Sequence, residues 1–577
     1  MKKLRWPIFI AVLAVAVVAV LLYTQQQAVT PTQPIDQQVV IEPEAGGIYV
    51  EGLIGALNRL NPALDAYNPP DRDVDRLIFS GLIHFDDRGL PQGDLADSWG
   101  ISSDGLIYNF SLRANAVWHD GQPVTSDDVI FTLSLLRDPQ SPITDDLRTF
   151  WQQVVVERQD DKNLRFMLPE TFAPFLDYLT FGVLPAHLLG DLDFASMVSD
   201  HFNLAPVGSG PYRFDHLLIE DGKIAGVVLT VFKDYYAQKP YIEQVAFRYY
   251  PTARAALEAY QKGEILGISQ VTADILPDVL REPKLALQTG RISQLMIVLF
   301  NLDNPSVPFL KDVQIRRALL KGLNRQWMID QILGGQAILA NGPIFPGTWA
   351  YYEAIEQIAY DPTEAVTTLR KMGYTIPAGG GDVRSSEGVT LTLELLYPDD
   401  DTHAALAEAI RDDWARLGLQ VELKNVPYQD LIANYLDSRT YQAALIDLNL
   451  MQSPDPDPYP FWDQAQITGG QNYSKWDDRQ ASEYLEQARV TLDLTERTRL
   501  YRNFQVRFAQ MLPALPIAYP VYTYAVDASV QGVRMGALLS PSDRLRTISD
   551  WFLMAKRAVS APETPKAAPG AQPTSTP

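Results

Sequence analysis

Residues 389–426, VTLTLELLYPDDDTHAALAEAIRDDWARLGLQVELKNV, decide the fold class. Apolar side chains alternate over residues 389–395 and again over 419–426, as in two half-buried strands. Between them, residues 402–417 carry apolar side chains on one face of an amphipathic helix, and Gly418 provides a C-terminal stop. A strand, a helix and a strand joined by a long crossover predict a parallel pair with a right-handed connection. This stretch indicates an α/β fold.

Other segments extend this interpretation in both directions. Residues 293–301 (SQLMIVLFN) are almost continuously apolar, which is typical of a strand buried on both faces. Residues 513–526 combine Pro and Tyr with alternating apolar positions, which suits a strand near a domain crossing. Residues 108–112 alternate as a strand, and a helix over 125–136 would follow, with Thr125 as N-cap.

Two polar segments are open to a structural or a functional interpretation. Ligands of open α/β sheets bind beyond the carboxyl ends of strands, where Asp399, Asp400 and Asp401 lie. Capping of the following helix is the interpretation we favour for them. His119-Asp120 is followed by a Gly, so we expect turn geometry there rather than catalysis.

Composition excludes several classes of protein. The chain has 577 residues, and its 70 Asp and Glu against 48 Lys and Arg give a net charge of −22. Such an acidic chain is a poor partner for nucleic acid or anionic lipid. Cys is absent, which excludes disulfides, thiolate metal sites and iron–sulfur clusters. The six His residues are scattered without a pair at helical spacing, so we expect neither a metal nor a cofactor.

The two ends differ from the middle of the chain. Residues 1–23 begin with three cationic side chains and continue as 18 residues without a charge, enough for about 27 Å of helix. We predict an uncleaved membrane anchor with an inside N-terminus and an extracytoplasmic globular part, with a cleaved signal peptide as the alternative. Residues 24–43 are typical of a stalk linker, and residues 558–577, rich in Pro, of a disordered tail.

Short motifs follow one another in a fixed order along the chain. They are DLADSW (94–99), VWHDG (117–121), TSDDV (125–129), GSGPY (208–212), LFN (299–301) and DPDP (455–458). Their shared order over about residues 46–540 is more specific than any single motif. In this order they resemble one family, the extracellular solute-binding proteins of family 5, which serve peptide and nickel ABC importers.

The resemblance implies a two-lobed, periplasmic-binding-protein-like clamshell of the large type, which has an extra domain. Two strands, near 297–301 and 516–524, would cross as the hinge. Domain I would comprise residues 44–75, 205–297 and 525–557, domain II 76–204, and domain III 298–524. The implied function is capture of a small hydrophilic, peptide-like solute by hinge closure, and delivery to permease subunits in the membrane. The protein would act as a monomer.

The position of each segment in the family gives the candidate ligand-binding residues. A loop with Tyr67, Asn68 and Asp71 would face the cleft from domain I, although a solvent turn driven by Asn-Pro-Pro is an equal alternative. Peptide-binding relatives carry an Asp for the peptide's amino group where this chain has Leu450 to Asp457, which puts that contact in doubt. The candidates from domain III are Asn301, Trp349, Met451, Gln452, Ser453, Asp455, Asp457 and Trp462.

Simpler structural roles are possible for these residues, and other functions are possible for the chain. Turn formation in the Asp-Pro repeat is a simpler role for Asp455 and Asp457, and core packing for Trp349 and Trp462. A membrane-tethered sensor or scaffold would use the same fold. An enzyme such as a glycoside hydrolase would need a tuned carboxylate pair, and neither Gly-x-Ser-x-Gly nor His-Glu-x-x-His occurs.

Overall fold

The computed structural model describes residues 39–86, 89–143, 145–449, 455–536 and 538–559. The chain divides into two compact units, one of residues 45–553 and one formed by the two ends of the chain. In the smaller unit β1 (Val39–Glu44) pairs antiparallel with β22 (Met554–Val559). The structure differs here from the predicted stalk over 24–43 and tail from 558. Residues 39–41 are Val-Val-Ile, which favour a strand, but their partner lies at the opposite end of the chain.

The predicted membrane anchor, residues 1–23, lies outside the described residues. So do the remainder of the predicted stalk up to residue 38 and the tail from 560. Among the residues that the structure describes, no helix combines the length and the apolar character needed to cross a membrane.

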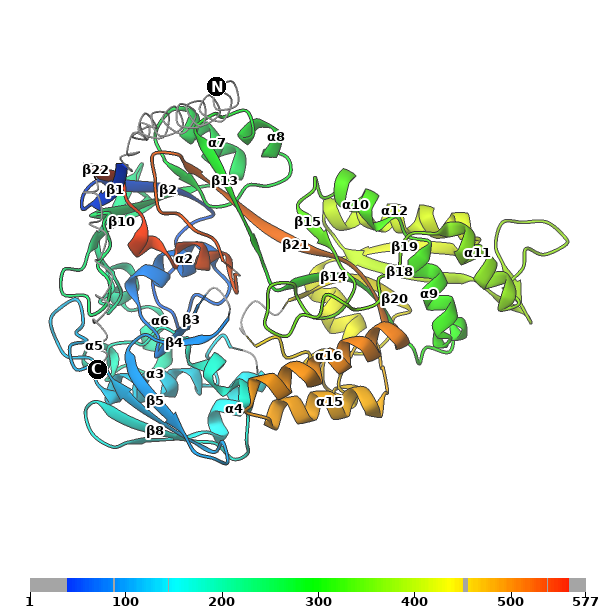
Figure 1. Ribbon diagram of the computed structural model, residues 1–577, viewed down its shortest axis with the longest axis horizontal. Helices are drawn as coiled ribbons and strands as arrows, with labels where there is room; N and C mark the ends of the chain where they lie inside the picture. Colours follow the sequence, from blue (N-terminus) through cyan, green and yellow to red (C-terminus); the bar gives the residue numbers. More distant parts are fainter. Residues whose placement is uncertain (1–38, 87–88, 144, 450–454, 537, 560–577) are drawn as a thin grey trace, which may run out of the picture. The chain divides into compact units, whose positions relative to one another are not determined.

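The larger unit is organised around one long strand, β21 (Ala514–Asp527). Its first half pairs with β14 (Gln294–Phe300) and β15 (Ala337–Leu339), and its second half with β12 (Gly267–Ile268) and β13 (Leu285–Arg291). Figure 1 shows β21, in orange, running from one group of strands to the other. We call these groups the β18 half and the β2 half, after the strands described next.

The β2 half holds a mixed sheet in the order β12-β2-β11-β10-β9, with β13 also on β21. The pairs β2–β11 and β2–β12 are parallel, and the others are antiparallel. Tyr49, Leu53 and Phe247 belong to its buried core. Its further elements are β2 (Ile48–Ile54), β9 (Tyr212–Glu220), β10 (Lys223–Val231), β11 (Gln244–Tyr250), α2 (Pro69–Ile78), α7 (Ala253–Gln261) and α8 (Leu276–Val279).

The β18 half confirms the interpretation of residues 389–426. β18 (Thr392–Pro398) lies parallel to both β19 (Gln420–Val426) and β20 (Ala443–Asn449), and α12 (Asp401–Leu417) connects β18 to β19. Gly418 ends α12 with φ 87°, a left-handed conformation that glycine adopts without strain. The other helices of this half are α9 (Val313–Lys321), α10 (Arg325–Gln331), α11 (Pro362–Lys371), α13 (Tyr428–Asp430), α14 (Tyr459–Trp462), α15 (Arg479–Val490) and α16 (Leu494–Met511).

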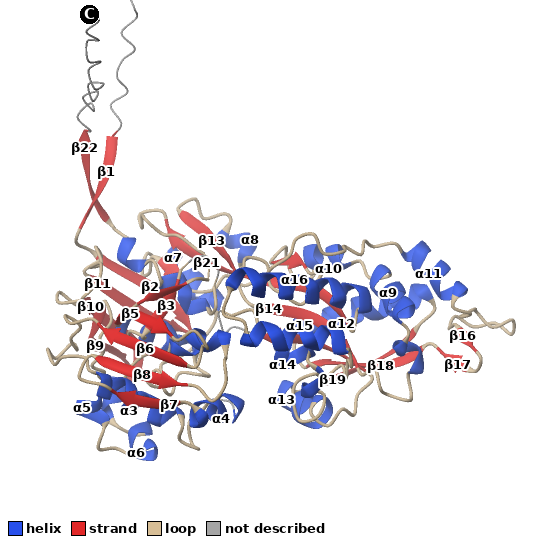
Figure 2. Ribbon diagram, turned by 60° about the horizontal axis from the view of Figure 1, so that its bottom comes forward, coloured by secondary structure: helices blue, strands red, loops and turns tan. Residues whose placement is uncertain are grey.

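A third region, residues 82–204, contains its own four-stranded antiparallel sheet with the order β5-β6-β8-β7 (Figure 2). The predicted alternation holds in β6, where Tyr108, Phe110 and Leu112 are buried. The elements are β3 (Ile83–Phe85), β4 (Pro91–Gly93), β5 (Ala96–Ile101), β6 (Ile107–Leu112), β7 (Val155–Arg158), β8 (Asn163–Met167), α3 (Ser126–Leu136), α4 (Asp145–Gln153), α5 (Ala186–Leu189), α6 (Phe194–Val198) and the 3₁₀ helix η1 (Ala173–Leu179). Outside this region, β16 (Ser385–Ser386) pairs antiparallel with β17 (Val389–Thr390).

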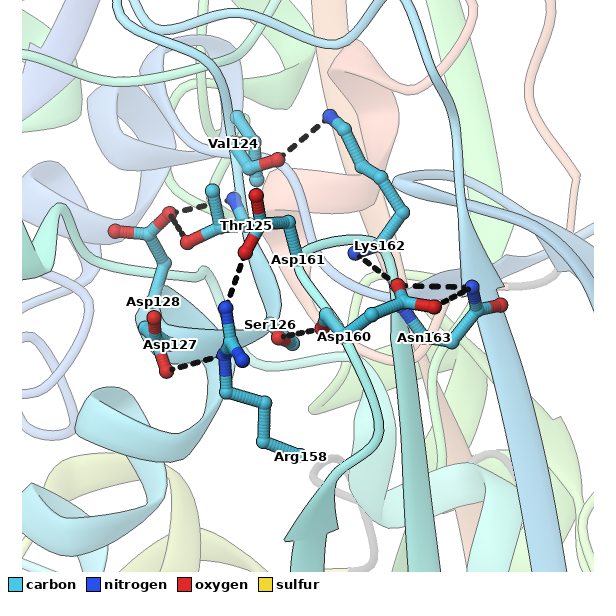
Figure 3. A network of polar contacts seen from close by, with 10 residues as sticks. All are labelled: Val124, Thr125, Ser126, Asp127, Asp128, Arg158, Asp160, Asp161, Lys162 and Asn163. Atoms are coloured by element: carbon cyan, nitrogen blue, oxygen red, sulfur yellow. Dashed lines mark hydrogen bonds and ion pairs between the residues drawn. The ribbon is translucent and has the colours of Figure 1, made fainter.

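The TSDDV motif has a structural role, which Figure 3 shows. Thr125 is the N-cap of α3, as predicted, and its N–H donates to Asp128 Oδ2 at 2.7 Å. The turn between β7 and β8 lies alongside, where the Ser126 hydroxyl donates to the Asp160 carbonyl and Lys162 Nζ donates to the Val124 carbonyl at 2.7 Å. The motif therefore joins a helix start to a hairpin.

The VWHDG and GSGPY motifs contact each other. His119 Nδ1 accepts the Gly208 N–H and His119 Nε2 donates to the Gly210 carbonyl, both at 3.1 Å. A Cβ on Gly208 would lie 2.0 Å from the Ile78 carbonyl oxygen, so only glycine fits there. Burial lowers the pKa of His119 to about 4, which keeps the ring neutral. The turn interpretation of His119-Asp120 is confirmed, since the Asp120 carboxylate accepts the Gln122 N–H.

Candidate functional site

The chain passes between the β2 half and the β18 half along two adjacent strands. β13 pairs with β21 up to Arg291 opposite Val521, and β14 resumes the pairing from Met296 opposite Ala518. The change of partner thus falls at residues 292–295 on one side and at 519–520 on β21. A cavity of about 30 Å³ lies there, lined by Arg291, Ser293 and Trp349 among others. It has room for a water but not for a solute.

A much larger groove, of about 510 Å³, lies in the β18 half. Because β18, β19 and β20 are parallel, their carboxyl ends share one edge of the sheet, and the groove is at that edge. Asp447 of β20 also lies opposite Met296 of β14, close to the change of partner. The lining residues are Pro398, Asp399, Asp400, His403, Pro427, Tyr428 and Asp447.

His403 holds the centre of this groove. Its Nδ1 lies 2.7 Å from Asp400 Oδ2, and its Nε2 lies 3.5 Å from Asp447 Oδ2. Burial opposes a charge on the ring, but the Asp447 and Asp400 carboxylates outweigh it, so the pKa of His403 is raised. Asp400 also caps α12 by accepting the His403 N–H at 2.9 Å, which confirms the predicted capping role.

Two further contacts shape the walls. The Tyr428 hydroxyl donates to the Asp447 carbonyl at 3.3 Å, and Asn425 Nδ2 donates to Asp399 Oδ1 at 3.0 Å. Within the described residues, Asp447 Oδ1 and His403 Nε2 are buried without a hydrogen-bond partner. The wall of the groove therefore contains a buried carboxylate oxygen and a buried ring nitrogen that make no hydrogen bond within the described part of the chain.

The comparisons with known proteins identify the family. The sequence pattern of the bacterial extracellular solute-binding proteins, family 5 Middle, matches residues 91–503. The chain belongs to this family. The oligopeptide-binding protein AppA of Bacillus subtilis is 24% identical over 523 residues, which cover 89% of this chain and 92% of AppA. The dipeptide-binding protein of Escherichia coli is 25% identical over 469 residues, covering 76% and 82% of the two chains.

The fold agrees with this family. The structure of the ABC transporter substrate-binding protein CtaP from Listeria monocytogenes matches with a TM-score of 0.72 and 25% identity, covering 88% of this chain and all of CtaP. The chain thus has the two-lobed α/β fold of periplasmic binding proteins. It serves as the solute-binding component of an ABC importer, a role of binding rather than of catalysis in this family.

The three candidate residues expected from domain I have different surroundings in the structure. Tyr67 is 80% exposed, and Asn68 Nδ2 donates to the Ala56 carbonyl at 3.0 Å. Asp71 is buried, and its two carboxylate oxygens accept the N–H groups of Asn58 and Arg59, each at 2.9 Å. Asp71 thus holds the loop after β2 in place. Burial raises its pKa, against these hydrogen bonds.

Asp455 and Asp457 are each paired with an arginine in this solute-binding protein. Arg497 Nη2 lies 2.7 Å from Asp455 Oδ2, and Arg489 Nε lies 2.7 Å from Asp457 Oδ2, with both carboxylates buried. Asp457 also accepts the Tyr459 N–H, as a turn residue would. The structure thus places them in ion pairs and does not bring them to the groove.

The remaining candidates from domain III either make structural contacts or lie outside the described residues. Asn301 Nδ2 donates to the Arg439 carbonyl at 2.9 Å, and Trp462 packs in the core with its ring centroid 4.8 Å from that of Phe508. Trp349 lines the small cavity and lies 5.0 Å from the Arg497 guanidinium. Met451, Gln452 and Ser453 lie outside the described residues.

Sequence reasoning missed His403, Asp447 and Tyr428 as groove residues. A signal existed in the spacing of Asp400 and His403, which places a carboxylate and an imidazole on one helical turn at the end of a strand. Asp447 carried no such signal, because its position beside His403 follows only from the pairing of β18 with β20.

Proposed function

We propose that the chain captures a small hydrophilic, peptide-like solute and that solute binding closes the β2 half and the β18 half about the strand crossing. The observation that carries this proposal is β21, which belongs to both halves. A solute that touches both halves stabilises the closed form, whereas a solute that touches one half equally in both states shifts nothing. The names of AppA and the dipeptide-binding protein support a peptide-like solute.

The same proposal includes where the protein works and with what. The apolar N-terminal segment would hold the chain at the outer face of the cell membrane, either as an uncleaved anchor or before cleavage as a signal peptide. Permease subunits would receive the closed form, and the chain would act as a monomer.

Native mass spectrometry of the full-length protein tests the capture. We expect an excess mass of one small solute per chain, released on unfolding and identified by fragmentation as a peptide. The mass of the bare polypeptide, together with no binding from a mixture of dipeptides to pentapeptides, would contradict the proposal.

A further inference from the structure

We propose that Asp177 of η1, at the contact between the third region and the β18 half, is a proton-operated latch that favours the closed form. A protonated Asp177 holds the contact together, and loss of that proton favours opening. The inference rests on the proposed function, because it adds a control by pH to the closure about β21. It involves none of the residues that line the groove.

The latch joins two bodies that lie on either side of the strand crossing. His119 of the third region bonds to Gly208 and Gly210, just before β9. The Tyr236 hydroxyl, between β10 and β11, donates to Asp94, which also fixes the third region to the β2 half. α15 and α16 belong to the β18 half, where they share a buried core with β14 and β20. A contact between the third region and α15 would therefore break when the two halves move apart.

Three neighbouring contacts build this interface. η1 packs against α15. The Arg489 guanidinium of α15 lies 5.6 Å from the centroid of the Phe172 ring. Leu492 follows α15 and approaches Gly105 so closely that a Cβ on Gly105 would lie 3.0 Å from Leu492 Cδ1. The third region and the α15–α16 hairpin thus meet through both apolar and charged side chains.

A buried group of charges lies at the same contact. Asp177 is 7% exposed, and its carboxylate accepts the Asp455 N–H. Its Oδ2 makes no hydrogen bond to any residue that the structure describes. The charged and titratable groups around Asp177 and Asp455 are Asp457 before α14, Arg489 from α15, Arg497 and Tyr501 from α16, Tyr178 from η1 and Tyr108 from β6.

The charges do not balance when every carboxyl is ionised. Arg497 is paired with Asp455 and Arg489 with Asp457, each at 2.7 Å. With Asp177 included, three carboxylates face two guanidiniums, which leaves a net charge of −1. A proton on Asp177 cancels that charge. A buried carboxylate beside another is destabilising, so the contact favours the protonated carboxyl.

Proton binding is therefore linked to the contact. Burial, followed by the Asp455 carboxylate, raises the pKa of Asp177 well above its usual range while the contact is closed. The pKa of Asp455 is raised as well, so the two carboxyls titrate as a pair. When the halves separate, water reaches Asp177 and its pKa returns to about 4. The closed form thus gains most below about pH 4 and loses this advantage as pH rises towards the raised pKa.

Pulsed EPR on the full-length protein without solute tests the latch. Ser98→Cys in β5 and Glu422→Cys in β19, both exposed, place one spin label in the third region and one in the β18 half. We expect the ratio of closed to open molecules to fall as pH rises from about 5 to about 8, by at most about tenfold per pH unit. Distance distributions that do not change with pH would overturn the latch.

Three variants assign the response to the contact. Asp177→Asn imitates the protonated carboxyl, so the closed fraction should stay high and vary less than twofold over the same range. Asp455→Asn releases Arg497 to balance the Asp177 charge, so the midpoint should move to lower pH. Asp191→Asn is the matched control, because Asp191 is exposed between α5 and α6, and it should respond like the unaltered protein. An unchanged response in Asp177→Asn, or a midpoint at higher pH in Asp455→Asn, would overturn the proposal.

The latch and the capture of a solute can fail separately in these measurements. If the empty protein responds to pH as expected but binds no peptide, the latch stands and the proposed solute is wrong. If a solute closes the protein but a change of pH does not, solute capture stands and the latch is overturned.

Discussion

Arg544 gives the sharpest stability prediction, through the substitution Arg544→Met. The guanidinium is fully buried between two carboxylates, since Nε donates to Glu51 Oε1 at 2.9 Å and Nη1 and Nη2 donate to Asp73 at 2.7 and 2.9 Å. Tyr49 donates to the other Glu51 oxygen at 2.6 Å. The triad therefore ties the segment after β21 to β2 and α2.

The expected magnitude follows from what the variant leaves behind. Glu51 is 0% exposed and Asp73 is 5% exposed, so both carboxylates would lose their counter-charge without gaining water. Breaking a buried pair in this way costs about 3–5 kcal/mol, a large share of the total stability of a domain. Burial already raises the pKa of Glu51, so at lower pH this carboxyl takes up a proton in the variant and the loss should shrink.

Denaturant unfolding at pH 8 and pH 5 measures this loss. We expect about 3–5 kcal/mol at pH 8 and less at pH 5, with partial recovery in the triple variant Arg544→Met, Glu51→Gln, Asp73→Asn. Arg534→Met is the control, because Arg534 is 67% exposed in a surface pair with Asp550 and should cost under about 1 kcal/mol. A loss below about 1 kcal/mol for Arg544→Met at both pH values would refute the reasoning.

Two other predictions concern pH. In the folded protein the pKa of His119 is lowered to about 4, whereas the unfolded value is about 6.5. The neutral ring therefore contributes fully to stability above pH 6.5, and the free energy of unfolding should fall by about 3 kcal/mol as pH falls from 6.5 to 4. His119→Gln should remove this dependence in denaturant titrations, and an unchanged slope would count against it. Burial, aided by the neighbouring Asp455 carboxylate, raises the pKa of Asp177 well above its usual range, so stability falls as pH rises above about 4. Asp177→Asn should flatten that fall, and a steeper fall would contradict the assignment.

Local patterns predicted the elements of this fold well. The strand, helix and strand over 389–426 could be predicted because the spacing of apolar residues, the Asp residues at the helix start and Gly418 at its end all agree. The apolar run 293–301 became β14, and the alternation after Pro513 became β21. These signals lie within a few residues of each other, so a single sequence contains them.

Pairings between segments far apart in the chain could not be predicted from the sequence in this way. The triad of Arg544 with Glu51 and Asp73 joins segments far apart in sequence, and β1 finds its partner at the other end of the chain. The same holds for the candidate site. Asp455 and Asp457 belong to a recognisable motif, yet each is paired with an arginine. Asp447 lies beside His403 only because of the strand pairing, which the sequence alone does not indicate.

Closure about the strand crossing is the central claim, and a distance measurement by pulsed EPR tests it most directly. The chain has no Cys, so Lys223→Cys in β10 and Glu422→Cys in β19, both exposed, give one spin label in each half. The full-length protein is measured empty and with a solute whose one-to-one binding native mass spectrometry has established. We predict a shift of the distance distribution to a new narrow maximum on binding. Identical distributions with and without bound solute would contradict the account.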